Sequence, residues 1–217
     1  IINSGVEINF DNVNIAGTII NKSENDLVIN LIDGSSNFLD TLHSKGNLVF
    51  QGSGSLNVHE NGIDVDKNIT INSGNIYFSG SGLATINGGN IYFDSFTGDY
   101  TVEGGSVVNI GNSVLSEPSS DSLLNYLHFN LENNISSDTL VTLVNSSNEV
   151  IVSFIATKDF NDLIICSDKL VAGEYYLYTG GVNTGVLDNN FYKEGEYTIG
   201  DIVTINGNST FIISGIR

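Results

Sequence analysis

The sequence predicts an all-β protein that starts with a parallel β-helix, a solenoid of stacked turns, and ends with a small antiparallel β module. A short pattern occurs four times between Leu48 and Ile110: two alternating apolar residues, a tight turn with Gly, and a second alternating pair. Helical spacing of apolar residues is hard to find. After Gly111 the pattern gives way to separate apolar runs divided by turn signals, which is typical of antiparallel strands.

The spacing inside each copy predicts that the chain bends at the Gly. In the third copy Ala84 and Ile86 precede the turn, and Ile91 and Phe93 follow it after a step of five residues. Because side chains alternate sides along a strand, an odd step would turn the second pair outward in a continuous strand. The turns hold Gly54, Gly74, Gly89 and Gly105, with steps of 20, 15 and 16 residues. Each Gly is therefore expected to be a corner, with successive turns stacked about 4.8 Å apart.

The remaining segments complete the predicted domain organisation. Residues 5–47 alternate less regularly and are interpreted as earlier turns, so the solenoid is assigned to residues 1–114. Residues 115–122 are polar, contain the single Pro and are expected to be a linker. Residues 123–217 are expected to form a sandwich-like β module that helps to cover the open end of the solenoid.

Composition narrows the classes of partner. The chain has 25 acidic and 7 basic residues, a net charge of −18, which argues against nucleic acids and anionic membranes. No run of 18 apolar residues is present, so membrane insertion is not expected. Cys166 lies in an apolar run and is expected to be a buried packing residue. The chain has no Met, which suggests a processed piece of a longer precursor, and a monomer is expected.

Two parts of the chain resemble a known family. Residues 61–78 and 84–93 resemble the turns of bacterial carbohydrate-binding β-helix proteins, best known in clostridia and structurally similar to pectate lyases. Residues 140–154 and 170–181 resemble the C-terminal module of that family. The resemblance implies a right-handed helix, a secreted or bacterial cell-surface location, bound calcium, and affinity for plant polysaccharides such as pectin or cellulose. The acidic segment that precedes each strand in the family remains clear here only at residues 60–63, so fewer calcium sites are expected.

Two outward columns are the predicted carbohydrate-binding residues. Tyr77 and Tyr92 occupy the same repeat position between inward residues, so they should stack one turn apart. Thr70, Thr85 and Thr101 should form a second column on the neighbouring strand. Aromatic faces pack on sugar rings while hydroxyls bond to sugar hydroxyls, so a polysaccharide could lie along this strip. The alternative is that like residues stack only because solenoids favour ladders.

Three carboxylates within seven residues are the predicted metal ligands. Glu60 precedes a Gly corner, and Asp64 and Asp66 should share the outward side of one strand. Carboxylate oxygens are the ligands that Ca²⁺ prefers. These side chains could equally be solvated surface charges.

The leading functional prediction is non-catalytic, extracellular polysaccharide binding that calcium could assist. A lyase needs a cationic base, and the predicted solenoid offers only Lys22, Lys45 and Lys67. The pair Asp64 and Asp66 could reach the spacing of an inverting hydrolase, but so could residues two apart on any strand. The alternatives are a structural or adhesive stalk and, less favoured, a pectate-lyase-like enzyme. Exposed, coplanar tyrosines would distinguish a binding strip from a stalk, and the net charge favours neutral or calcium-bridged chains.

Overall fold

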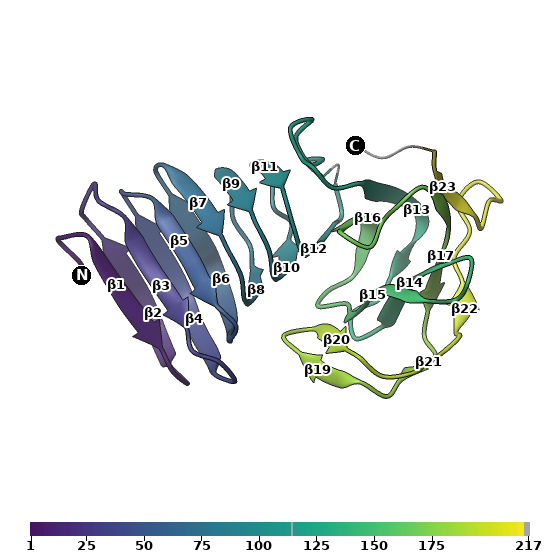
Figure 1. Ribbon diagram of the computed structural model, residues 1–217, viewed down its shortest axis with the longest axis horizontal. Helices are drawn as coiled ribbons and strands as arrows, with labels where there is room; N and C mark the ends of the chain where they lie inside the picture. Colours follow the sequence, from purple (N-terminus) through teal and green to yellow (C-terminus); the bar gives the residue numbers. More distant parts are fainter. Residues whose placement is uncertain (114, 215–217) are drawn as a thin grey trace.

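The computed structural model describes residues 1–113 and 115–214, except for the side chains of Glu60 and Asn61. All regular structure in the described part is β-strand (Figure 1). No helix in this part is long and apolar enough to cross a membrane.

Two parallel sheets form the solenoid and confirm the predicted parallel β-helix. The odd-strand sheet has the order β1-β3-β5-β7-β9-β11, and the first six even strands lie side by side in a second sheet, here called the even-strand sheet. Each turn of the solenoid therefore consists of one strand from each sheet (Figure 1). The odd strands are β1 (Val6–Phe10), β3 (Leu27–Leu31), β5 (Leu48–Gly52), β7 (Asn68–Ile71), β9 (Leu83–Ile86) and β11 (Asp99–Val102). The even strands are β2 (Asn14–Asn21), β4 (Ser36–Ser44), β6 (Ser55–Val65), β8 (Asn75–Phe78), β10 (Asn90–Asp94) and β12 (Ser106–Gly111).

The turns become shorter along the chain. Leu27 pairs with Leu48, a step of 21 residues, whereas Ile69 pairs with Ala84, a step of 15. The difference lies in the even strands, since β6 has 11 residues and β8 has 4. The solenoid is therefore narrower at β8, β10 and β12, and the C-terminal module lies beside this narrow part (Figure 1).

The Gly corners follow from steric demands of the stacked turns. Gly74, Gly89 and Gly105 have φ of 106°, 90° and 81°, a region that residues with a Cβ rarely adopt. A Cβ on Gly89 would lie 2.3 Å from the carbonyl oxygen of Gly74, the corner one turn earlier. At the first corner the positive φ falls on Gly52 and not on Gly54. The predicted corners are thus confirmed, with a local difference in the first copy.

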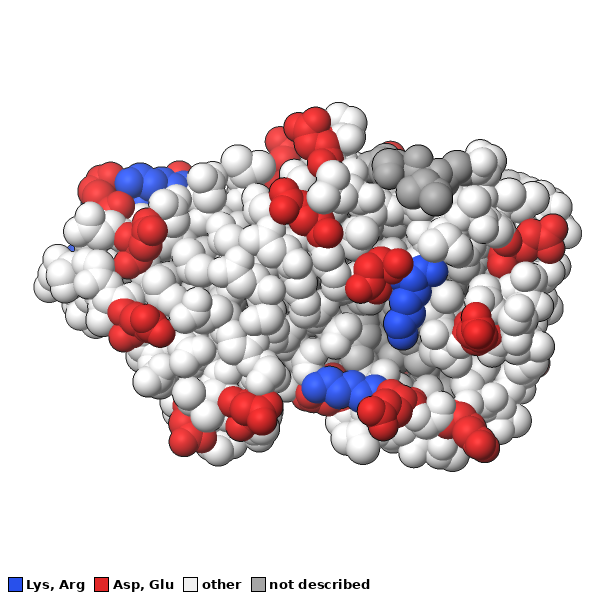
Figure 2. Space-filling view, in the orientation of Figure 1, with Lys and Arg blue, Asp and Glu red and all other residues white. Residues whose placement is uncertain are grey.

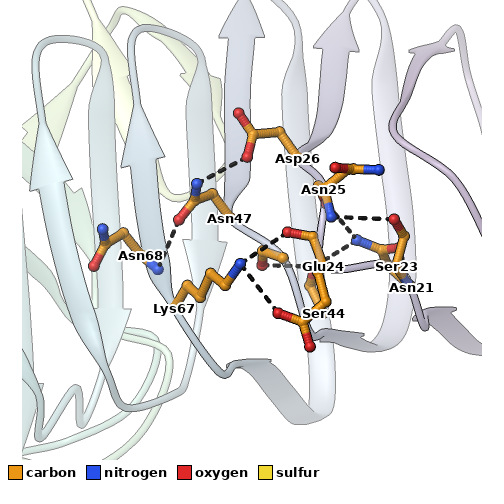
Figure 3. A network of polar contacts seen from close by, with 10 residues as sticks. Asn21, Ser23, Glu24, Asn25, Asp26, Ser44, Asn47, Lys67 and Asn68 are labelled. Atoms are coloured by element: carbon orange, nitrogen blue, oxygen red, sulfur yellow. Dashed lines mark hydrogen bonds and ion pairs between the residues drawn. The ribbon is translucent and has the colours of Figure 1, made fainter.

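Asparagine side chains tie successive turns together at the opposite corner, where even strands lead into odd strands (Figure 3). The Nδ2 of Asn47 donates to Asp26 Oδ1 at 2.8 Å, and its Oδ1 accepts from the backbone N–H of Asn68 at 3.3 Å. Buried Asn21 donates to Ser44 Oγ at 3.0 Å. These amides satisfy backbone and side-chain groups of neighbouring turns, which gives part of the amide-rich composition a structural role.

The C-terminal module extends the solenoid instead of standing apart from it. β16 (Phe160–Ser167) pairs antiparallel with β12, and β13 (Tyr126–Ile135) pairs with β16, so the even-strand sheet has eight strands. A second sheet packs on it as a sandwich and has the order β19-β20-β15-β14-β17-β22, with β23 also paired to β17. Its strands are β14 (Leu140–Asn145), β15 (Val150–Ile155), β17 (Gly173–Thr179), β19 (Val186–Asp188), β20 (Phe191–Lys193), β22 (Asp201–Ile202) and β23 (Phe211–Ile213); β18 (Val182–Asn183) pairs with β21 (Tyr197–Thr198).

Two apolar cores lie on either side of the even-strand sheet. The inward residues of both solenoid sheets form one core, which includes Phe50, Phe78 and Phe93. Cys166 lies fully buried in this core, as predicted. Outward residues of β10 and β12, including Tyr92 and Val108, form the second core with the module.

The segment 115–122, predicted to be a linker, also caps the solenoid. The Ser119 N–H donates to the Tyr100 carbonyl at 2.7 Å, and the Leu123 N–H donates to the Val102 carbonyl at 2.9 Å. Ser122 Oγ accepts from the Val102 N–H at 3.0 Å. These contacts satisfy the open edge of β11, which would otherwise present unpaired backbone groups to solvent. Val114, the last residue of the predicted solenoid, lies outside the described residues.

Candidate functional site

Tyr77 and Tyr92 point outward from the even-strand sheet, but the module covers the second ring. The two residues pair in register on β8 and β10, with ring centroids 5.5 Å apart and an interplanar angle of 42°. Tyr92 is 0% exposed and packs against the rings of Phe154 and Phe191. The expectation of an exposed, coplanar pair is therefore wrong, because the module folds over the narrow end of the solenoid.

Both phenol groups help to join the solenoid to the module. The Tyr92 hydroxyl accepts from the Thr157 N–H at 3.2 Å, and burial raises the pKa of Tyr92. The Tyr77 hydroxyl donates to Asp94 at 3.0 Å; burial and the negative charge of Asp94 raise the pKa of Tyr77 to about 12. Lys158 of the module forms an ion pair with the same Asp94 carboxylate.

The threonine column lies on the opposite side of the solenoid from the tyrosines. Thr70, Thr85 and Thr101 pair in register in the odd-strand sheet, where they are half-exposed. The prediction placed the two columns beside each other, which is wrong. Consecutive strands of a two-sheet solenoid belong to opposite sheets, so their outward side chains face opposite directions.

Two further rings lie in line with the tyrosines. We call the four residues Phe38, His59, Tyr77 and Tyr92 the aromatic row. The ring centroids of Phe38 and His59 are 6.2 Å apart with an interplanar angle of 8°, and those of His59 and Tyr77 are also 6.2 Å apart. Exposure falls along the row, from 41% at Phe38 to 0% at Tyr92. Phe38, His59 and Tyr77, here called the open half of the row, form a solvent-accessible aromatic surface. Tyr92, at the other end, packs against the module.

Sequence reasoning missed Phe38 and His59 because their turns are irregular. The pairing of β4 with β6 shifts register between Leu39 and Thr41, so the repeat pattern does not align these strands with the later ones. Before that shift Phe38 pairs with Asn57, which pairs in turn with Tyr77. The sequence of β4 gives no clear signal for Phe38, because Phe38 and Leu39 are adjacent apolar residues and their spacing does not tell which of them points outward.

Asn57 carries a polar atom that the chain leaves unsatisfied. Its position in register is between Phe38 and Tyr77, next to the open half of the aromatic row. The Oδ1 atom of Asn57 is buried and finds no hydrogen-bond partner in the described part of the chain. Since buried acceptors without a partner are rare and costly, this oxygen is suited to accept a hydrogen bond from a bound molecule.

A hairpin of the module crosses the same face. β19 and β20 are joined by Asn189 and Asn190, whose φ of 45° and 72° correspond to the tight two-residue turn that twisted strands favour. Asp188 accepts hydrogen bonds from Ser55 Oγ and from Asn75 Nδ2. Asn189 Nδ2 donates to the carbonyls of Leu56 at 2.8 Å and Asn75 at 2.9 Å.

Three hollows border this hairpin, and one of them, of about 460 Å³, is lined by residues 33–36 and 53–55 together with Val186, Leu187, Asp188, Asn189 and Lys193. The aromatic hollow, of about 260 Å³, is lined by Phe38, Asn57 and Asn190 together with Ser36, Asn37, Ser55, Leu187 and Asn189. The distal hollow, of about 400 Å³, is lined by Asn90, Ser106, Val150, Ile151, Val152, Ser153, Asp168, Lys169, Phe191, Tyr192 and Glu194, with Gly105 and Gly195. Figure 2 shows a recess at the junction of solenoid and module, with basic side chains at its border. The outer face of the even-strand sheet thus carries a groove, which the hairpin partly divides.

The predicted metal ligands occupy a different place. Asp64, at the end of β6, forms a hydrogen bond with His43 Nδ1 at 3.1 Å, and Asp64 and Asp66 line one hollow with Lys22 and Lys45. The side chain of Glu60 lies outside the described residues. Among the residues that the structure describes, no three His, Cys, Asp or Glu side chains gather as metal ligands. Calcium binding here stays a prediction, and the neighbouring ammonium groups oppose it electrostatically.

Comparison of the chain with models of protein families, with curated protein sequences and with solved structures found no match. The resemblance to carbohydrate-binding β-helix proteins therefore stays a prediction. The functional argument rests on the geometry of the groove.

Proposed function

We propose that this protein binds a polysaccharide without cleaving it, in the groove on the outer face of the even-strand sheet. The observation that carries the proposal is the open half of the aromatic row, Phe38, His59 and Tyr77, beside the unsatisfied Asn57 oxygen. Aromatic rings pack against the apolar faces of sugar rings, and amide and hydroxyl groups bond to sugar hydroxyls. A role of this kind suits a protein that is secreted or displayed on a bacterial surface.

The charge of the groove favours a neutral polysaccharide. No charged residue lines the aromatic hollow, although the whole chain has a net charge of −18. A polyanion approaching this groove would be repelled by the average field of the protein, and the cations near the groove, Lys158 and Lys193, already pair with Asp94 and Asp188. A neutral chain needs neither a local cation nor a bridging calcium ion.

The carboxylates near the row support binding rather than catalysis. Asp94 is held by Tyr77 and Lys158, and Asp188 is held by Ser55, Asn75 and Lys193. Burial alone would raise the pKa of Asp188, but hydrogen bonds from Lys193 and Ser55 lower it below its usual value. An ionised carboxylate that already accepts several hydrogen bonds is a poor general acid.

Substitution of Phe38 tests this proposal against a matched control. Affinity electrophoresis in gels containing a neutral soluble glucan or pectic acid should show retardation by the neutral glucan. Phe38→Ala should weaken that binding about fivefold, since one aromatic contact contributes about 1 kcal/mol. Leu83→Ala removes an apolar side chain that is 49% exposed on the odd-strand sheet and should leave the retardation unchanged. Equal retardation of both variants, or none for the unmodified protein, would contradict the proposal.

A second candidate function is a structural or adhesive stalk. The burial of Tyr92 favours it, because the most regular outward ladder of the repeats joins the module to the solenoid instead of meeting solvent. A stalk would show no retardation by any polysaccharide in the same gels.

A further inference from the structure

The aromatic and distal hollows beside the hairpin belong to one column of polar residues. Ser36, Ser55, Asn75, Asn90 and Ser106 are paired in register across β4, β6, β8, β10 and β12. The aromatic hollow contains the first two of these residues, and the distal hollow contains the last two. Asn75, which is 3% exposed, lies beneath the hairpin, and Ser55 also contacts its tip through Asp188.

The tip of the hairpin is attached to the solenoid through polar groups. Asp188 and Asn189 bond to Ser55, to Asn75 and to the Leu56 carbonyl, and these are groups that sugar hydroxyls could bond equally well. On its outer side Val186 is 71% exposed, so little apolar packing holds the tip down. Exchanging such hydrogen bonds for those of a ligand changes the free energy little.

The root of the hairpin, in contrast, is fixed. Phe191 is buried against Tyr92 and pairs with Phe154 of β15. The Asn190 carbonyl accepts from the Ile155 N–H at 2.8 Å. The hairpin can therefore pivot at Phe191 while the module stays in place.

We propose that the β19–β20 hairpin is a movable strap across one continuous groove, and that a linear polysaccharide occupies the whole column when the strap lifts. This inference rests on the proposed function, whose site it extends. The column from Ser36 to Ser106 covers four strand spacings, about 19 Å. A long oligosaccharide should therefore bind more tightly than a short one, which fits the aromatic hollow alone.

A reversible disulfide between Ser55→Cys and Asp188→Cys tests the strap. The two side chains are in hydrogen-bond contact, and Cys166 is buried away from them. Calorimetric titration with a long neutral oligosaccharide should show at least tenfold weaker binding to the oxidised protein, and reduction should restore it. Equal affinity in the two states would overturn the strap. Loss of binding by the unmodified protein as well would overturn the proposed function itself, so the two failures are distinguishable.

Asp188→Asn provides a second test that needs no cross-link. It removes the charge that strengthens the hydrogen bonds from Ser55 and Asn75, so it should favour the lifted strap. Affinity for the long oligosaccharide should rise severalfold, because less free energy is spent on lifting the strap. Unchanged or weaker binding to this variant would contradict the proposal.

Discussion

Tyr77 and Tyr92 show how one repeat position can have two roles. They stand in register one turn apart, yet Tyr77 is half-exposed and Tyr92 is buried against Phe154 and Phe191. The repeat correctly predicted that both side chains point away from the solenoid core. It could not indicate what covers them, because the covering residues lie more than sixty positions away in a segment without the repeat.

At the scale of single residues, substitution of Asn57 gives the most specific prediction. Asn57→Leu removes a buried oxygen that lacks a partner, so the free energy of unfolding should stay equal or rise by up to about 1 kcal/mol. The same change should weaken binding of a neutral oligosaccharide, since the acceptor for a sugar hydroxyl is lost. Urea unfolding and calorimetric titration measure the two effects.

Asn87→Leu is the matched control for that substitution. Asn87 lies on the odd-strand face of the solenoid and donates to Asn72 Oδ1 at 2.8 Å. Its loss should lower stability slightly and leave oligosaccharide binding unchanged. If Asn57→Leu behaved in the same way, with lower stability and full binding, the role given to the Asn57 oxygen would be wrong.

At the scale of elements, the Gly corners could be predicted from the sequence. The capping role of the segment 115–122 could not. The odd step of five residues across Gly74, Gly89 and Gly105 requires a bend, whatever else the chain does. The segment 115–122 has no such internal signal. Its hydrogen-bond partners are backbone groups of Tyr100 and Val102, and these form an open edge only once the solenoid exists.

His128 connects the cap, the segment 115–122, to β16, and the strength of this connection depends on pH. Its Nδ1 lies 2.8 Å from Glu117 of the cap, and its Nε2 lies 2.6 Å from Asp162 of β16. Tyr126 also donates to Glu117, and the Leu115 N–H donates to Asp162. Two carboxylates on one imidazole favour its doubly protonated form. Partial burial alone would lower the pKa of His128, but the hydrogen bonds to Glu117 and Asp162 outweigh it and raise the pKa above 6.5.

The sign of the resulting pH dependence follows from linkage. A pKa raised by folding means that the folded state holds the proton more tightly, so the stabilisation is complete below about pH 6.5 and is lost as the pH rises through the folded-state pKa. The free energy of unfolding, measured from about pH 6 to about pH 9, should fall over this interval. His128→Gln should remove that part of the fall. An identical pH profile for the variant would show that His128 does not hold the cap.

At the scale of the whole molecule, the arrangement depends on pairing between distant segments. β12 and β16 join Ser106 to Ser167 in register, which makes the module a continuation of the solenoid sheet. The sequence indicated the two regions and their all-β character, since each has its own pattern of apolar residues. The shared sheet was not predictable, because nothing local in β16 distinguishes a strand of the module from one that extends the solenoid.

The shared sheet is also what forms the groove. The later turns are short, and the hairpin of the module lies over β6 and β8, so that it covers part of the outer face of the even-strand sheet. The outer face of the odd-strand sheet carries the half-exposed threonine column. The proposed binding site therefore lies on one face of the solenoid, and the other face has no part in it.

Hydrogen–deuterium exchange with and without a saturating neutral oligosaccharide tests this assignment most directly. Exchange should be slower in residues 36–39 and 55–58, which line the groove, and unchanged in β7, β9 and β11 of the odd-strand sheet. Protection confined to the odd-strand sheet, or no protection anywhere at saturating ligand, would contradict it.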